Sequence, residues 1–305
     1  MVADSAAAVA LLPPSVTEVV ADKVYAIGGT IPAQQSLTWS PRRSGWLPIQ
    51  CYLFQDGAES LLIDTGVAVH RAEVMRGIAA LLGGRGAPRM TMTRWEPDSI
   101  INLPSVLKTF EIRSVVWSGP LNPLDFFEGI EKASIDGHLQ ATTGVALQRE
   151  PPGSVLKLGD LRLEIVKPTM NVLATYWFYE TETRTLLTSD SFGYLTSPTP
   201  GGPQIAANAA RDITTDGAAE FLRTKFDWMI GIDTKPLQNE LLAIMRARPV
   251  DRICPGFGCI IEGPAAVAHA VDRTIEAMKL LGRERRASAL AGLDWSRAEL
   301  KGSGE

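Results

Sequence analysis

The order of strand-like and helix-like segments is the feature that most limits the folds open to this chain. Apolar periodicity predicts a first group of strands and helices over residues 23–117, hairpins over 155–188, and a second group of strands and helices up to residue 281. Two such groups predict two similar halves, each a sheet covered by helices on one side.

Turn residues and helix breakers divide these groups into elements. Asp56-Gly57 and Gly159-Asp160 are hairpin signals, and Gly83 ends a helical pattern. The predicted strands are residues 23–27, 50–54, 60–64, 89–93, 114–117, 155–166 as a hairpin, 176–179, 185–188 and 252–255. The predicted helices are residues 69–82, 97–110, 216–229, 236–248 and 264–281, and residues 196–210 are predicted to form a surface loop.

Composition narrows the classes of function. The chain has 305 residues, 45% apolar and 21% charged, which fits a globular protein with a domain over 1–283 and a charged tail over 284–305. Net charge is −4 and no long basic run occurs, which argues against a nucleic-acid binder. No run of about 18 apolar residues predicts a membrane span. Three cysteines are too few for a disulfide framework, so we expect a cytoplasmic protein.

Two segments of the first half combine turn-forming residues with acidic ones. Residues 62–66 (LIDTG) end a predicted strand and contain Asp64. Taken alone, they fit an ordinary strand-ending turn as well as they fit part of a functional site. Residues 93–99 (TRWEPDS) lie between a predicted strand and a predicted helix start, and they carry Glu96 and Asp98. This second segment brings two carboxylates close together in the chain.

Three further segments follow in the second half. Residues 168–171 (PTMN) precede a predicted strand, residues 187–193 (LTSDSFG) carry Asp190 at the end of another, and residues 254–258 (CPGFG) end the last strand in a glycine turn. The order and spacing of all five segments resemble those of the metallo-β-lactamase superfamily, in the form of the β-lactamase-like domain of flavodiiron proteins. The resemblance spans Gln50 to Cys259 and implies an α+β fold, the four-layer αβ/βα sandwich of the metallo-β-lactamase type.

The resemblance also implies that a metal site has been lost. Asp64 matches a family aspartate that does not bind the metals itself but supports their ligands. Asp190 matches the carboxylate that bridges the two metals. Glu96 and Asp98 match two further carboxylate ligands. The family's histidine ligands fall on positions that carry other residues here, namely Arg94, Ser99, Asn171 and Phe257.

Arg94 has a clear consequence for the chemistry. A guanidinium group only donates hydrogen bonds and always carries its charge, so it cannot ligate a metal. We expect Arg94 to replace the charge of the missing metals by pairing with the carboxylates. The predicted degenerate-site pocket consists of Asp64, Arg94, Trp95, Glu96, Asp98, Ser99, Asn171, Asp190 and Phe257. No catalytic residue is assigned, and no metal or other cofactor is expected in this chain.

Several alternatives remain open at this stage. Glu96, Asp98 and Asp190 could hold one hard cation such as Mg²⁺, Ca²⁺ or Mn²⁺. Cys254 and Cys259 could form a soft-metal site, although buried structural cysteines are more common. His70 is expected on the surface or against a helix, and His138 and His269 receive no role. Trp95 is the residue best placed to line a pocket for a flat aromatic ligand.

We carry three hypotheses of function from the sequence. The first is a subunit of a heteromeric hydrolase whose metal site, with zinc or iron, is on a related partner chain of the same fold; a homo-oligomer is the alternative assembly. The second is a stand-alone hydrolase that holds one metal on the remaining carboxylates. The third is a protein that binds a small molecule or haem in the vacated pocket. The sequence does not identify the small-molecule substrate.

Overall fold

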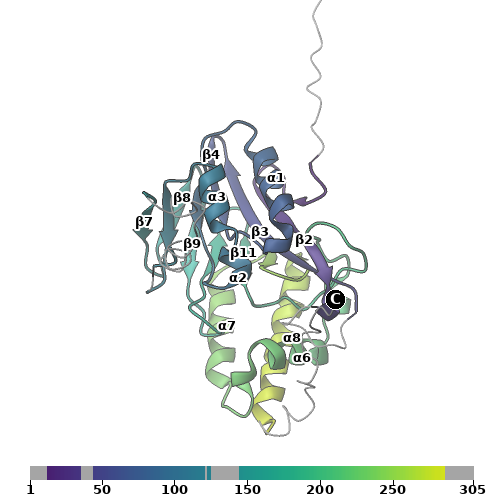
Figure 1. The fold of residues 1–305 in the computed structure, drawn as a ribbon. Coiled ribbons are helices and arrows are strands. Elements are labelled where there is room, and N and C mark those ends of the chain that lie inside the picture. Colours follow the sequence, from purple (N-terminus) through teal and green to yellow (C-terminus); the bar gives the residue numbers. More distant parts are fainter. Residues whose placement is uncertain (1–11, 36–43, 121, 125–143, 286–305) are drawn as a thin grey trace, which may run out of the picture.

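The computed structural model describes residues 12–35, 44–120, 122–124 and 144–285. Two β-sheets lie face to face, and helices cover the outer face of each sheet (Figure 1). These four layers form the αβ/βα sandwich predicted from the sequence.

The first sheet is built from the amino-terminal half of the chain. Its strands follow one another in sequential order, antiparallel from β1 to β4 and parallel from β4 to β7. Asp56-Gly57 forms the predicted hairpin turn, with Gly57 in the left-handed conformation at φ 58°. The strands are β1 (Val16–Val20), β2 (Val24–Pro32), β3 (Trp46–Asp56), β4 (Glu59–Ile63), β5 (Arg89–Thr91), β6 (Ser114–Trp117) and β7 (Ala146–Arg149).

The second sheet is built from the carboxyl-terminal half. Its order is β13-β12-β11-β10-β9-β8, and the pair of β11 with β12 is parallel while the other neighbours are antiparallel. Gly159-Asp160 joins β8 to β9 as predicted. The strands are β8 (Val155–Leu158), β9 (Leu161–Val166), β10 (Trp177–Glu180), β11 (Thr185–Ser189), β12 (Arg252–Pro255) and β13 (Ile261–Glu262).

Helices form the two outer layers. Figure 1 shows α1 and α3 against the first sheet and α6, α7 and α8 on the side of the second. Helix α1 ends at Gly83, whose φ of 52° is the left-handed conformation of a helix carboxyl end. The helices are α1 (Arg71–Leu82), α2 (Pro97–Ile100), α3 (Leu103–Thr109), α5 (Ala209–Asp212), α6 (Thr215–Lys225), α7 (Lys235–Ala247) and α8 (Pro264–Arg283).

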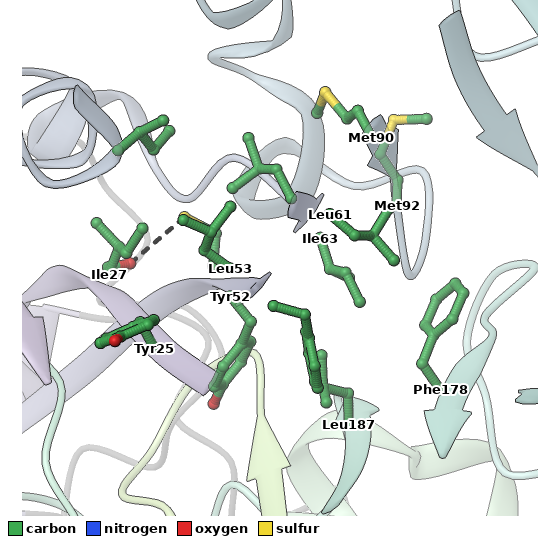
Figure 2. Close-up of a cluster of buried hydrophobic side chains, with 14 of the residues drawn as sticks. Tyr25, Ile27, Tyr52, Leu53, Leu61, Ile63, Met90, Met92, Phe178 and Leu187 are labelled. Atoms are coloured by element: carbon green, nitrogen blue, oxygen red, sulfur yellow. Dashed lines mark hydrogen bonds between the residues drawn. The ribbon is translucent and has the colours of Figure 1, made fainter. Parts of the chain in front are cut away.

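The buried core has two parts because successive strand residues point to opposite faces of a sheet. Phe178 of β10 and Leu187 of β11 belong to the cluster that also holds Ile63 of the first sheet (Figure 2). Trp177 and Tyr179, the neighbours of Phe178 in β10, pack with the residues of α6 to α8. The second sheet is therefore buried on both faces, which fixes the position of the loops at its strand ends.

Two predicted helices are interrupted. The helix predicted over 97–110 is two helices, α2 and α3, and Pro104, which has no backbone N–H, lies in the first turn of the second. The helix predicted over 216–229 ends at Lys225, because Phe226 leaves the helical conformation at φ −127° and ψ 49°. A 3₁₀ turn, Asp227–Met229, follows. The second interruption places Lys225 at a helix end.

Some predictions lie outside the described residues, namely His138 and the tail over 286–305. Of the tail, Glu284 is described, and it pairs with Arg223 of α6 at 2.5 Å. In the described part of the chain, no helix has the length and apolar character needed to cross a membrane.

Candidate functional site

The strand ends that carry the predicted acidic residues meet at one end of the sandwich. Asp64 follows β4 and Arg94 follows β5, and these strands are parallel neighbours. Asp190 follows β11 and Phe257 comes after β12, which are also parallel neighbours. Parallel neighbours end at the same edge of a sheet, so their loops converge. We call this region the loop end; it comprises residues 64–70, 93–102, 168–176, 189–193 and 255–258.

Arg94 lies at the centre of the loop end. Its side chain is only 1% exposed. Its Nε atom lies 2.9 Å from Asp190 Oδ1 and 3.4 Å from Glu96 Oε2. Its Nη1 donates to Ser189 Oγ at 2.7 Å, and its Nη2 donates to Asp98 Oδ2. The predicted pairing of Arg94 with the carboxylates is confirmed.

A second cation, Lys225, reaches the same carboxylates from the end of α6. Its Nζ lies 3.1 Å from Glu96 Oε2 and 3.4 Å from Asp190 Oδ1, and its side chain is 9% exposed. The same Nζ lies 5.4 Å from the ring centre of Phe257, within range of a cation–π interaction. Lys225 is not predicted from the sequence, because no local motif marks it. We call Arg94, Lys225, Glu96, Asp98 and Asp190 together the ion-pair cluster.

Burial and pairing act in opposite directions on the pKa values of this cluster. Burial raises the pKa of Asp190 to about 6, despite the opposing charges of Arg94 and Lys225. Burial also acts to raise the pKa of Glu96, but the two cations outweigh it and hold that pKa below its usual value. Burial acts to lower the pKa of Arg94, but the neighbouring carboxylates raise it above its ordinary value. Arg94 is therefore a permanent cation.

The contact of Arg94 with Asp190 is an ion pair without hydrogen-bond alignment. Although Nε and Oδ1 are 2.9 Å apart, neither carboxylate oxygen of Asp190 has an aligned hydrogen-bond donor among the described residues. Asp190 is 1% exposed. A buried carboxylate held by charge alone depends strongly on its cations, so their loss leaves it uncompensated.

The backbone of the loop end departs from relaxed geometry at three non-glycine residues. Asp64 has a φ of 66°, Ser189 a φ of 57° and Phe192 a φ of 67°, all in the left-handed region that side chains disfavour. Gly256 is needed for a different reason: a Cβ there would lie 3.0 Å from the carbonyl oxygen of Ser189 and 3.2 Å from Arg94 Nη1. The glycine lets the turn after β12 approach the guanidinium of Arg94 closely.

Asp64 supports the segment that carries Arg94. Its two carboxylate oxygens accept hydrogen bonds from the backbone N–H and the hydroxyl of Thr93, both at 2.7 Å. Burial raises the pKa of Asp64 to about 7, although the charge of Arg94 and the hydrogen bonds from Thr93 oppose this. The carbonyl of Ser99 accepts from the backbone N–H and hydroxyl of Thr65, both at 2.8 Å. Asp64 and Ser99 thus join the first strand end to the segment 93–102.

Trp95 lines an apolar hollow, as predicted for a pocket residue. The hollow has a volume of about 220 Å³ and is lined by Trp95, Pro97, Ile100 and Ile101. It lies on the segment that carries Glu96 and Asp98, so it borders the ion-pair cluster. None of these four described residues has an ionisable side chain.

Other candidates lie apart from the cluster. Asn171 donates to the carbonyls of Pro168 and Thr169 in its own loop, at 2.8 and 3.0 Å. His70 is 9% exposed, packs against Gly29 and directly precedes α1, so of its two predicted positions, on the surface or against a helix, the surface one is excluded. His269 Nε2 pairs with the carbonyl of Ile213 at 2.8 Å.

The three cysteines are buried and free of disulfides. Cys254 is fully buried and Cys259 is 3% exposed. Burial raises the pKa of each of these two thiols to about 12. Their burial fits the role of structural core residues.

The side chains of the loop end do not fit a two-metal centre. Such a centre needs several open donor groups around each ion, whereas the carboxylates here are held by Arg94 and Lys225. A metal ion beside the Arg94 guanidinium would meet a fixed positive charge at the centre of the donor set. Within residues 12–35, 44–120, 122–124 and 144–285, no group of three or more His, Cys, Asp or Glu side chains is arranged to hold a metal ion.

Comparison with solved structures identifies the architecture. The rubredoxin oxygen:oxidoreductase of Desulfovibrio gigas is similar with a TM-score of 0.62 and 16% identity, over 87% of this chain and 61% of that one. The flavodiiron protein of Giardia intestinalis is similar with a TM-score of 0.60 and 16% identity, over 86% and 59% of the two chains. The fold is that of the metallo-β-lactamase type.

The matched structures differ in how much of their own length this chain covers. A fragment of a putative diflavin flavoprotein from Nostoc sp. is covered over 97% of its length, with a TM-score of 0.57 and 16% identity. By contrast, the chain spans about three fifths of the length of the Desulfovibrio and Giardia proteins. No protein-family model and no curated protein sequence matches this chain. At these identities the likeness concerns the fold alone.

Proposed function

We propose that this chain is a metal-independent member of the metallo-β-lactamase fold that works as a subunit rather than as a two-metal enzyme. The observation that carries the proposal is the guanidinium of Arg94, which is buried among Asp98, Asp190 and Glu96. These carboxylates match family metal ligands in the sequence resemblance. Arg94 and Lys225 supply two positive charges beside these three carboxylates, so we expect the scaffold to persist without the ions around which such a site is built.

The chain's partner is proposed to be a related chain of the same fold that keeps an intact metal site with zinc or iron. That partner would hold the small-molecule substrate and perform the reaction. Hydrolysis is the reaction class we propose first. The name of the Desulfovibrio protein, an oxidoreductase, favours a redox reaction as the second class. We expect an obligate interface of roughly 2,000 Å² or more of buried surface.

Two other candidate functions have specific support. A small-molecule binder is favoured by the apolar hollow at Trp95, which fits a flat aromatic group better than a polar cofactor. A stand-alone hydrolase with one hard cation is favoured by the partial exposure of Glu96 and Asp98, 17% and 20% of their side chains. Lys225 and Arg94 argue against the stand-alone hydrolase, because a metal ion would have to displace both side chains from the carboxylates.

Co-expression tests the proposal. The chain is produced alone and together with a genome-neighbouring chain that carries an intact Thr-His-x-Glu/His-x-Asp-His run. We expect a stable complex, metal in the partner only, and activity of the partner that falls when this chain is omitted. A chain in which Arg76, an exposed residue of α1, is substituted is produced in the same way. It controls for effects of handling and expression. Full activity of this chain alone would overturn the proposal.

A further inference from the structure

Another hollow lies between the start of α7 and the end of α8, which pack side by side in the outer layer (Figure 1). Its volume is about 220 Å³, below the roughly 300–1,000 Å³ of sites for drug-sized ligands, so it suits a small molecule. Ile232, which is 39% exposed, lines the hollow, so the hollow opens to solvent. The described residues that line it are Ile232, Asp233, Thr234, Lys235, Gln238, Lys279, Gly282 and Arg283. None of these residues belongs to the ion-pair cluster.

Three cations line this hollow in a chain whose net charge is −4. Lys279 pairs with Glu276 of its own helix at 2.7 Å. Lys235 and Arg283 are exposed, and neither forms an ion pair with another described residue. Asp233 brings a carboxylate to the lining, and its Oδ1 accepts the backbone N–H of Lys235 at 3.0 Å. The described lining therefore carries more positive than negative charge, and the amino end of α7 adds to it, so the hollow attracts an anion.

Gln238 adds a hydrogen-bond acceptor that has no donor. Its residue is 5% exposed and lines the hollow. Its Nε2 donates to Thr234 Oγ1 at 2.9 Å, and that hydroxyl donates to the carbonyl of Met278 at 3.0 Å. In the described part of the chain, no group donates a hydrogen bond to Gln238 Oε1. A largely buried amide oxygen is stabilised by a donor, so a ligand with a hydroxyl group complements this one.

Gly282 allows the two helices to share this hollow. A Cβ at this position would lie 2.9 Å from the carbonyl oxygen of Ile232 and 3.2 Å from Thr234 Oγ1. The last turn of α8 therefore comes close to the residues that precede α7. Because of this close approach, cations of both helices line one hollow.

We propose that this hollow binds a small phosphate monoester that carries a free hydroxyl group. A phosphate monoester has a charge of about −1.5 to −2 at pH 7 and three strong acceptor oxygens, so it engages several cations at once, whereas a carboxylate has a single charge. Lys235, Lys279 and Arg283 bind the phosphate group. The hydroxyl group donates to Gln238 Oε1. The site shares no residue with the ion-pair cluster, so this inference does not depend on the proposed function.

Isothermal titration calorimetry of the full chain, in a buffer without phosphate, tests the site. Glycerophosphate and inorganic phosphate are the two probes, and we expect saturable binding of both, tighter for glycerophosphate. Arg283→Gln and Lys235→Gln each remove a charged hydrogen-bond donor, which is expected to raise the dissociation constant of both probes about 10-fold. Arg246→Gln is the matched control, because Arg246 is an exposed cation in the last turn of α7 and does not line the hollow. Its dissociation constants should equal those of the wild type.

Gln238→Met tests the contact with the hydroxyl group. Methionine has a similar length but no carbonyl oxygen, so the preference for glycerophosphate over inorganic phosphate should disappear. A general disturbance of the hollow would weaken both probes alike and leave the preference unchanged. Far-UV circular dichroism checks that all four variants are folded.

Several results would overturn the proposed site. The first is the absence of saturable binding of glycerophosphate at concentrations up to about 10 mM. The second is an equal loss of affinity in Arg246→Gln and Arg283→Gln, because that would show a general charge effect. The third is binding of lactate, a hydroxylated carboxylate, as tight as that of glycerophosphate, because that would exclude selection for phosphate. Each of these results leaves the metal-independent subunit intact, since metal analysis tests that proposal separately.

Discussion

Replacing Arg94 by alanine tests whether the ion-pair cluster holds the loop end together. The substitution removes a 1%-exposed cation from Asp190, which is equally buried, and from Glu96 and Asp98. Removing one partner of a buried ion pair costs about 3–5 kcal/mol, because the remaining charge stays uncompensated. Lys225 still compensates part of that charge, and the other two carboxylates reach solvent, so we expect a loss near the lower limit, about 3 kcal/mol.

Urea unfolding followed by far-UV circular dichroism measures this loss. Arg76→Ala is the matched control, since Arg76 is 66% exposed and pairs with Glu73 at the surface at 3.2 Å. That control should change the free energy of unfolding by less than about 0.5 kcal/mol. Arg94→Lys keeps the charge but loses the planar fork, so it should fall between the two. A loss below about 1 kcal/mol for Arg94→Ala would refute the argument that buried charge compensation stabilises this end.

Three further predictions concern the same site. Lys225→Met should cost about 1–3 kcal/mol in urea unfolding, less than Arg94→Ala, because Arg94 still pairs with Glu96 and Asp190; an equal or larger loss would contradict this order. Asp64 has a folded pKa of about 7, above its unfolded value, so its contribution to stability is present below about pH 4 and is lost as pH rises through 7. The stability of the wild type relative to Asp64→Asn should therefore fall by more than about 1 kcal/mol between pH 4.5 and 7.5, and parallel pH profiles would argue against it. Arg94→His should not create zinc or iron binding, because it supplies one ligand of four; one equivalent of metal by plasma mass spectrometry would disprove that count.

The fold could be predicted because local signals and the global arrangement agree. Asp56-Gly57 and Gly83 each need a left-handed or turn conformation, and the structure has one at Gly57 and Gly83. The predicted strand over 176–179 is present as β10, and successive strand residues point to opposite faces, so Phe178 and Trp177 lie in different core clusters. Such signals act over a few residues, so a single sequence contains them.

The site could be predicted only in part, because its contacts depend on distant elements. Arg94 and its carboxylates follow from one segment and one strand end, and their pairing is confirmed. Lys225 enters from α6, whose end is set by the conformation of Phe226, and nothing nearby in the sequence identifies it. The apolar spacing continues across Pro104 and so predicts a single helix, whereas the missing N–H of Pro104 favours a new helix start.

Metal analysis of the purified chain tests the central claim most directly. The protein is isolated without chelator, its zinc, iron and manganese are measured, and its thermal unfolding is compared before and after dialysis against a chelator. We predict no stoichiometric metal and unchanged unfolding, because Glu96, Asp98 and Asp190 are each already paired with Arg94 or Lys225. One or more equivalents of tightly held zinc or iron, with a chelator-induced loss of stability, would contradict the account.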